Sequence, residues 1–199
     1  VIEAACEAAG AELFVVQPRL LKADARGVEF ELAGKTYWSP VLGAHQAQNA
    51  ALAVKVLQLL GFDEVDFSGL ELPGRLQRLG NFIVDGAHNP AALAAVLSEA
   101  KRLFGVKKVI FGASRDKDIR KMAEIFGDFK VILTRANTPR AAEPILIAKY
   151  FPGAKLTSSV EEALEAAGDE PTLVTGSFYV AGEALKALGW RPPAEAGTP

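Results

Sequence analysis

The sequence predicts an α/β fold with a C-terminal Rossmann-like, mostly parallel sheet that has helices on both faces and a smaller unit before it. From residue 81 onward, apolar stretches of strand length alternate with amphipathic helical stretches, which is typical of a parallel sheet covered on both sides. The residues before 61 instead show a hairpin pattern followed by one helix. Between them, residues 63–73 have no period and contain Ser, Gly and Pro, so we expect a boundary there.

Composition and charge exclude several classes of function. The 199 residues are 50% apolar and 23% charged, as in ordinary globular proteins with a packed core. The net charge of -2 provides no basic surface, so nucleic acid and membranes are not expected partners. No apolar run reaches the roughly 18 residues of a membrane helix. The single cysteine, Cys6, cannot form an intrachain disulfide, and we expect a cytoplasmic location.

Three local patterns predict the elements of the first unit. Apolar residues at helical spacing begin at Ile2, and the chain starts at Val1 and not at a methionine. We therefore expect it to be part of a longer protein. An apolar strand is expected at 12–16, and the alternating segments 28–32 and 36–38 predict a hairpin around a glycine turn. Apolar residues at helical spacing over 47–60 predict a helix that a glycine ends.

The second unit is predicted to contain five strands with helices between them. The expected strands are residues 82–85, 108–112, 130–134, 154–157 and 172–175. The clearest helix has apolar residues at helical spacing from Leu93 to Phe104. Ser159 and Glu162 have the spacing of a capping box, in which each side chain accepts a hydrogen bond from the other's backbone amide. The Pro/Ala/Gly-rich segment 191–199 is expected to be disordered.

Ligands of open α/β sheets bind beyond the carboxyl ends of the strands, which selects three loops as candidate sites. In the first loop, Asp85 ends a strand and Gly-Ala-His-Asn-Pro follows, with His88 beside an expected helix cap at Asn89. Free amides at that helix start would favour an anion next to Asp85 and His88. The same residues are equally compatible with a capped turn that carries a surface histidine.

The remaining candidates have ordinary structural interpretations as well. Residues 112–118, Gly-Ala-Ser-Arg-Asp-Lys-Asp, are more typical of a solvated loop at a helix start. Ser177 follows the last strand as a candidate ligand or as a simple N-cap. Upstream, Arg75 in Pro-Gly-Arg suits a phosphate or a carboxylate, although most exposed arginines are only solvated. Residues 45–49, His-Gln-Ala-Gln-Asn, are a weak signal at a helix start.

Several common motifs are missing from the sequence. It contains neither G-x-x-x-x-G-K-[ST] nor G-x-G-x-x-G, the two frequent nucleotide-binding motifs. It has no paired-cysteine or H-x-x-x-H pattern for a metal, and no G-x-S-x-G elbow for hydrolysis by serine. A chemical role therefore depends on the combination of loops rather than on a single motif.

Taken together and in this order, five segments resemble folylpolyglutamate synthases and bifunctional dihydrofolate synthases of the Mur ligase superfamily. The matching segments are 43–50, 73–75, 85–90, 112–118 and 176–183. The resemblance implies that residues 1–65 are the tail of a central ATP-binding domain, that 66–190 are a C-terminal Rossmann-like ligase domain, and that 191–199 are a tail. The phosphate loop and the Mg²⁺ ligands would then lie upstream of this chain.

The resemblance also implies roles for individual residues. Asn49, Arg75 and Asp85 would contact ATP. His88, the catalytic candidate, would lie near the phosphates or the incoming amine. Ser177 would help to place L-glutamate. No metal ligand is expected in this part of the protein.

The Asp-Lys-Asp element of Asp116, Lys117 and Asp118 belongs to the resemblance without an assigned role. Before it, Ser114 and Arg115 stand where the resemblance leads us to expect small or apolar residues. This departure leaves the detail of that loop open.

The implied reaction is the addition of L-glutamate to folate. A bifunctional enzyme would in addition join L-glutamate to dihydropteroate. The substrate carboxylate attacks the γ-phosphate of MgATP, and the glutamate amine then displaces phosphate from the acyl phosphate. We expect this chain alone to be inactive because it lacks the phosphate loop. Two alternatives stay open, namely a Mur-type ligase that extends a peptidoglycan precursor and a non-catalytic nucleotide-binding α/β module.

Overall fold

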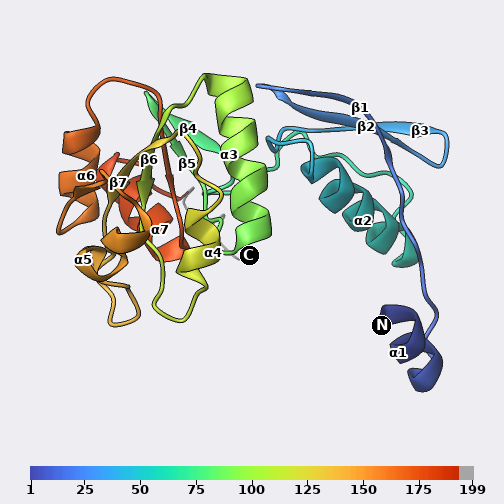
Figure 1. Cartoon of the computed structure of the whole chain (residues 1–199). Coiled ribbons are helices and arrows are strands. Elements are labelled where there is room, and N and C mark those ends of the chain that lie inside the picture. The colour runs from blue at the N-terminus through green and yellow to red at the C-terminus, as the bar shows by residue number, and fades with distance from the viewer. Residues whose placement is uncertain (193–199) are drawn as a thin grey trace, which may run out of the picture.

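A computed structural model describes residues 1–192, which form two units that each contain their own sheet (Figure 1). The first unit contains α1 (Ile2–Ala9), β1 (Arg19–Asp24), β2 (Gly27–Leu32), β3 (Lys35–Ser39) and α2 (Gln46–Leu59). The second contains β4 (Gln77–Leu79), β5 (Phe82–Val84), α3 (Pro90–Phe104), β6 (Lys108–Phe111), α4 (Ile119–Ala123), β7 (Lys130–Leu133), α5 (Pro144–Ile147), a 3₁₀ turn (Ala148–Tyr150), β8 (Lys155–Leu156), α6 (Val160–Ala167), β9 (Thr172–Thr175) and α7 (Phe178–Ala187).

The first unit packs one helix on one face of a three-stranded antiparallel sheet. Strands β2 and β3 form the predicted hairpin, and β1 pairs with the other edge of β2. Val28 and Phe30 of β2 contact Ala51 and Val54 of α2 in a small core. None of the residues of α1 is buried, and Figure 1 shows this helix apart from the sheet.

The predicted strand at 12–16 is wrong, and β1 takes its place a few residues later. An apolar run forms a strand only where a neighbouring strand supplies hydrogen bonds. The edge of β2 that does not face β3 is already occupied by β1, so residues 12–16 have no partner strand there. Val15 is accordingly 71% exposed. The sequence did not indicate β1 because its alternation is broken by a register shift between Leu20 and Lys22.

The second unit confirms the predicted fold class. Its six strands have the order β4-β5-β9-β6-β7-β8, and all neighbours are parallel except β4, which is antiparallel to β5. Alternate side chains of a strand point to opposite faces. Phe111 of β6 therefore packs in the core under α3 and α4, whereas its neighbour Ile110 packs in the core under α6 and α7. The sheet is thus covered by helices on both faces.

The second unit differs from prediction at β4 and at the start of α6. The sequence did not predict β4, which follows the arginine turn and reaches β5 through Gly80 with a positive φ of 60°. The capping box is half wrong, because Ser159 accepts from the Glu162 amide but the Glu162 carboxylate accepts from Ser158, both its amide and its hydroxyl. The predicted disordered tail lies outside the described residues from 193 onward.

The strand order creates a switch point between β5 and β9. The chain leaves β5 through α3, on one face of the sheet, and leaves β9 through α7, on the opposite face. Neighbouring parallel strands whose connections diverge in this way leave a crevice at their carboxyl ends, where open α/β sheets bind ligands. The loops that contain Asp85 and Ser177 flank this crevice.

Candidate functional site

The carboxylate of Asp85 ties two loops together at the carboxyl edge of the sheet. Its Oδ2 accepts a hydrogen bond from the backbone N–H of Leu76 at 2.9 Å, and its Oδ1 accepts one from the N–H of Ala87 at 2.8 Å. The first bond reaches the turn that carries Arg75, and the second stays within the loop after β5. Asp85 therefore fixes the position of the arginine turn relative to the sheet.

The arginine turn has a strained backbone. Gly74 and Leu76, on either side of Arg75, have positive φ angles of 67° and 45°. A leucine in this conformation costs about 1–2 kcal/mol, so surrounding contacts must hold it. Leu76 is 1% exposed and bonded to Asp85, while the N–H of Gly86 donates to the carbonyl of Gly74 at 2.9 Å. Strain that is held in this way is common at functional sites.

The ionisation of Asp85 reflects its enclosure. The side chain is 4% exposed, and burial raises the pKa of Asp85 above its usual value. The two backbone hydrogen bonds and the charges of Arg75 and His45 act in the opposite direction. Because both carboxylate oxygens already accept backbone hydrogen bonds, the observed role of Asp85 is to organise the edge.

The loop after β9 joins the same edge. The N–H of Gly176 donates to the carbonyl of Ala87 at 3.0 Å, which links this loop to the one after β5. Gly176 has a φ of 113°, and a Cβ there would lie 2.6 Å from the carbonyl oxygen of Gly112. The close approach therefore requires glycine. The loops after β5, β9 and β6 consequently meet side by side.

Two predicted helix caps are confirmed at this edge. Oγ of Ser177 accepts a hydrogen bond from the N–H of Val180 at 3.1 Å and starts α7. Asn89 starts α3 in the same way, with its Oδ1 2.9 Å from the N–H of Ala92. The Ser177 oxygen acts as an acceptor in the cap, which leaves its hydroxyl proton available to another partner.

Phe178 connects the predicted site residues to one another. The guanidinium carbon of Arg75 lies 4.9 Å from the centre of the Phe178 ring, and the ring of His88 lies 5.5 Å away at an angle of 47°. The structure thus brings Arg75, Asp85, His88 and Ser177 to one edge. Sequence reasoning missed Phe178 because an aromatic residue at a helix start usually belongs to the core.

The start of α2, in the first unit, contributes Asn49. This exposed side chain donates from Nδ2 to Oε1 of Gln46 at 2.9 Å. The neighbouring His45 is near enough to Asp85 for its charge to lower the pKa of that carboxyl. The helix start therefore adjoins the edge, although within residues 1–192 no hydrogen bond joins Asn49 to Arg75 or Asp85. His45 was only a weak sequence signal.

The Asp-Lys-Asp element forms structural contacts. Asp118 starts α4, with its Oδ1 3.2 Å from the N–H of Lys121. Asp116 forms ion pairs with Lys117 at 3.4 Å and with Arg140 at 3.6 Å. These contacts hold the loop after β6 against the loop after β7.

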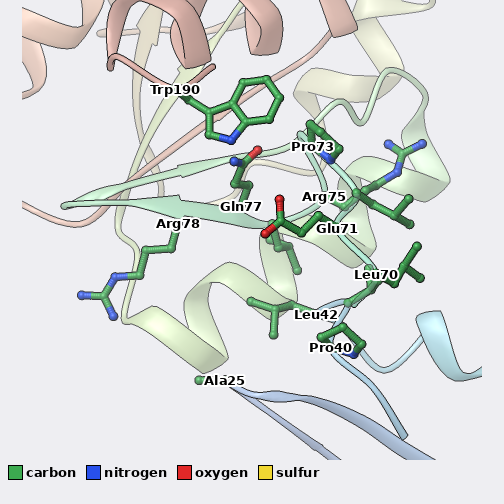
Figure 2. Close-up of a pocket in the computed structure, with 13 residues that line it drawn as sticks. Ala25, Pro40, Leu42, Leu70, Glu71, Pro73, Arg75, Gln77, Arg78 and Trp190 are labelled. Carbon is green, nitrogen blue, oxygen red and sulfur yellow. The ribbon is translucent and has the colours of Figure 1, made fainter. Parts of the chain in front are cut away.

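A cavity of about 350 Å³ lies between the two units and adjoins the arginine turn (Figure 2). Figure 2 shows Trp190 above it, Gln77 and Glu71 below the indole, and the Arg75 side chain pointing away from the indole. Of the five predicted site residues, Arg75 lines this cavity and the other four do not. The predicted residues therefore converge on an open edge rather than in the cavity.

The described part of the chain has neither a metal-binding cluster nor a membrane-spanning helix. Within residues 1–192, no group of three or more His, Cys, Asp or Glu side chains is arranged to hold a metal ion. None of the helices in this part has both the length and the hydrophobicity needed to cross a bilayer.

The edge coincides with the region that matches a known protein family. Residues 74–178 match the model described as Mur ligase, glutamate ligase domain. The match begins in the arginine turn and ends at Phe178, and it covers more than half of the 199 residues. The chain belongs to the Mur ligase family. In this Mur ligase chain, the matched segment includes every loop that meets at the edge.

Individual Mur ligase relatives cover larger parts of the chain. A probable bifunctional folylpolyglutamate synthase/dihydropteroate synthase of Haloferax volcanii is 31% identical over 73% of this chain and 20% of its own length. A UDP-N-acetylmuramoyl-L-alanyl-D-glutamate--2,6-diaminopimelate ligase of Vibrio parahaemolyticus is 39% identical over 57% of this chain and 26% of its own length. This chain therefore spans only a minor part of either relative.

The fold as a whole is similar to that of a solved enzyme. A Mycobacterium tuberculosis folylpolyglutamate synthase complexed with ADP superposes with a TM-score of 0.81 and 22% identity. The superposition covers 96% of this Mur ligase chain and 52% of the other chain, so both units of the present chain have counterparts. At this identity the likeness establishes the fold.

Proposed function

We propose that this chain is the C-terminal part of an ATP-dependent ligase that adds L-glutamate to folate, of the folylpolyglutamate synthase type. The observation that carries the proposal is the family match over 74–178, because it coincides with the loops of Arg75, Asp85, His88 and Ser177. The fold shared with a folylpolyglutamate synthase over both units supports the same assignment. Addition of glutamate to dihydropteroate is the second activity of a bifunctional parent.

The proposed domain organisation follows the two sheets. Residues 1–65 are the tail of the central ATP-binding domain, and residues 66–190 are the ligase domain. The absence of helix and strand over residues 60–76 supports a boundary there, as does the separation of the strands into two sheets. Cys6 is a free cysteine, which agrees with a cytoplasmic location.

The proposed nucleotide contacts come from both units. Arg75 binds phosphate oxygens, since a guanidinium offers five donors in a planar fork and, within residues 1–192, no hydrogen bond or ion pair occupies them. Asn49 reaches ATP from α2, and Asp85 contacts it from the loop that it organises. Mg²⁺ accompanies ATP to offset the charge of the transferred phosphoryl group, and its ligands belong to the part that holds the phosphate loop.

The proposed chemistry uses His88 and Ser177 at the same edge. Nδ1 of His88 lies 3.0 Å from the carbonyl oxygen of Gly86, and because a carbonyl only accepts, Nδ1 carries the proton. Nε2 is then the basic nitrogen that can receive a proton from the attacking glutamate amine. The hydroxyl of Ser177 donates to a glutamate carboxylate. Closure of the two units would exclude water from the acyl phosphate.

The test uses a polypeptide in which residues 1–192 replace the matching half of the Mycobacterium tuberculosis folylpolyglutamate synthase. Phosphate release is followed with MgATP, L-glutamate and tetrahydrofolate, dihydropteroate or a muramyl peptide precursor. We expect release that requires both glutamate and a pterin, is lost in Arg75→Ala and is retained in the matched control Arg78→Ala. The present chain alone should release no phosphate.

A second candidate is a ligase of peptidoglycan precursors, which the 39% identity to the Vibrio enzyme favours. Release with the muramyl peptide and not with either pterin would select this candidate. A chimera that folds and binds ATP but turns over none of the substrates would instead favour a non-catalytic nucleotide-binding module.

A further inference from the structure

Phe178 is an apolar side chain in an unusual place. It is the first residue of α7, directly after the Ser177 cap, and it is 50% exposed although its neighbour Val180 is buried. An exposed phenylalanine contributes little to a core, so its burial does not explain its presence at this position. Its contacts explain its presence, because two side chains of the proposed site pack against its ring.

The first of these side chains is Arg75. Its guanidinium carbon lies 4.9 Å from the centre of the Phe178 ring, within the range of a cation–π contact. Within residues 1–192 no hydrogen bond or ion pair holds this guanidinium, and Asp85 acts on it only through its charge. The ring therefore supplies the specific contact that orients Arg75. Stacking leaves the five N–H groups of the guanidinium free for an anion.

The second side chain is His88, whose ring lies 5.5 Å from that of Phe178 at an angle of 47°. On its other side, Nδ1 is fixed by the carbonyl of Gly86 at 3.0 Å. The imidazole is thus held by one hydrogen bond and one aromatic neighbour. This leaves Nε2 as its remaining polar atom.

The fold provides a recess for this ring. A Cβ at Gly86 would lie 2.4 Å from a ring carbon of Phe178, so a larger residue there would displace the ring. The aspartate loop therefore approaches the ring closely at Gly86, while the cap formed by Ser177 fixes the backbone that carries the ring. The recess, the cap and the two packed side chains come from three separate loops.

We propose that Phe178 is a positioning residue that sets the orientation of Arg75 and His88 together. The inference rests on the proposed function in so far as Arg75 binds nucleotide phosphates and His88 acts beside them. The ring links the phosphate-binding side of the edge to its proton-accepting side. A change at Phe178 should therefore alter both side chains, even though the ring itself takes no part in the chemistry.

The test compares Phe178→Leu with Phe178→Tyr in the whole chain. Leucine keeps an apolar side chain but loses the aromatic face, whereas tyrosine keeps the face. The Nε–Hε proton of Arg75 and the ring protons of His88 report by NMR whether each group still lies against an aromatic ring. MgADP titration measures the functional consequence. In a second pair of variants, Gly86→Ala adds a methyl group against the Phe178 ring. Its control, Gly182→Ala, adds one in open space.

In Phe178→Leu, the Arg75 and His88 resonances should lose their ring-current shifts, and MgADP should bind about 2- to 5-fold more weakly, as expected for an exposed cation–π contact of about 0.5–1 kcal/mol. Phe178→Tyr should restore both readouts. Gly86→Ala should resemble the leucine variant, and Gly182→Ala should resemble the wild type.

Unchanged Arg75 and His88 resonances in Phe178→Leu would overturn the proposal, and so would an MgADP affinity equal to that of the wild type. If the wild-type chain binds no MgADP, the proposed nucleotide contacts of this chain fail. The two sets of resonances then still decide whether Phe178 positions Arg75 and His88.

Discussion

The two units differ in how completely their apolar surfaces are covered. The sheet of the first unit has a helix on one face only, and Val56 and Leu59 of α2 and its C-cap Leu60 are 54%, 53% and 68% exposed. The sheet of the second unit lies between two cores, one under each layer of helices. A sheet covered on both faces buries far more apolar surface, so stability should reside mainly in the second unit.

This difference matters for the site because its residues are divided unequally between the units. The loops of Arg75, Asp85, His88 and Ser177 belong to the well-packed second unit, whereas Asn49 belongs to the first. Preorganised loops on a rigid sheet can hold a ligand in one geometry. The contribution of Asn49 instead depends on how the two units are held together.

The largest expected effect is the loss of a core aromatic in the second unit. Phe111 is fully buried and packs against the rings of Phe126 and Phe151. Phe111→Ala should lower the free energy of unfolding of that unit by about 3–5 kcal/mol. Urea unfolding followed by Trp190 fluorescence in a Trp38→Phe background measures it. Trp38 fluorescence in a Trp190→Phe background follows the unfolding of the first unit. If Phe111→Ala lowers the unfolding free energy of that unit by the same amount, the two units unfold together and the comparison fails.

The next effect concerns the link between the loops. Asp85→Ala leaves the buried N–H groups of Leu76 and Ala87 without their acceptor, which should cost about 2–6 kcal/mol in total, at about 1–3 kcal/mol for each group. Asp85→Asn keeps one acceptor oxygen and should cost roughly half as much. Urea unfolding of the two variants checks the order. Equal stabilities of wild type and Asp85→Ala would contradict the organising role.

A smaller effect of the opposite sign is expected at the end of β7. The hydroxyl of Thr134 is buried and, within the described residues, is the one buried side-chain polar atom without a hydrogen-bond partner. Thr134→Val replaces it with a methyl group of similar size and should stabilise the second unit by about 1 kcal/mol. Thermal unfolding measures the gain. A destabilised variant would mean that the hydroxyl has a partner in solution.

The smallest effect is a dependence on pH, for which the sign is diagnostic. Burial raises the pKa of Asp85 above its reference value of 3.8, so the folded state holds this proton more tightly than the unfolded state does. Its contribution to stability is therefore complete below pH 3.8 and is lost as the pH rises through the folded pKa. The difference in unfolding free energy between wild type and Asp85→Asn should grow as the pH falls from 7 to 4. If that difference shrinks as the pH falls, the pKa of Asp85 is lowered in the folded state and not raised.

Sequence patterns predicted the parts of the fold that depend on local periodicity. The strand Thr172–Thr175 matches its predicted bounds, and the caps at Asn89 and Ser177 follow from single residue types. The strand at 12–16 failed because pairing decides a strand as much as hydrophobicity does. No local pattern shows that β2 is paired with β1 instead.

The site was predictable to a similar degree. The loops after β5, β6 and β9 were identified because each follows a parallel strand, whereas Arg75 was selected as a cation on a glycine turn. The hydrogen bond from Leu76 to Asp85, the strained Leu76 and the stacking of Phe178 were not, because each depends on a contact between separate elements. Spacing within one segment carries no information about such contacts.

The central claim is that the edge formed by the second unit contacts nucleotide. Its most direct test is an NMR titration of the chain with MgADP, with the backbone and the Arg75 side chain assigned. The account predicts that shift changes concentrate at residues 74–76, 85–88 and 176–178, and that they weaken strongly in Arg75→Ala. Changes confined to the cavity below Trp190, or none at millimolar MgADP, would contradict it.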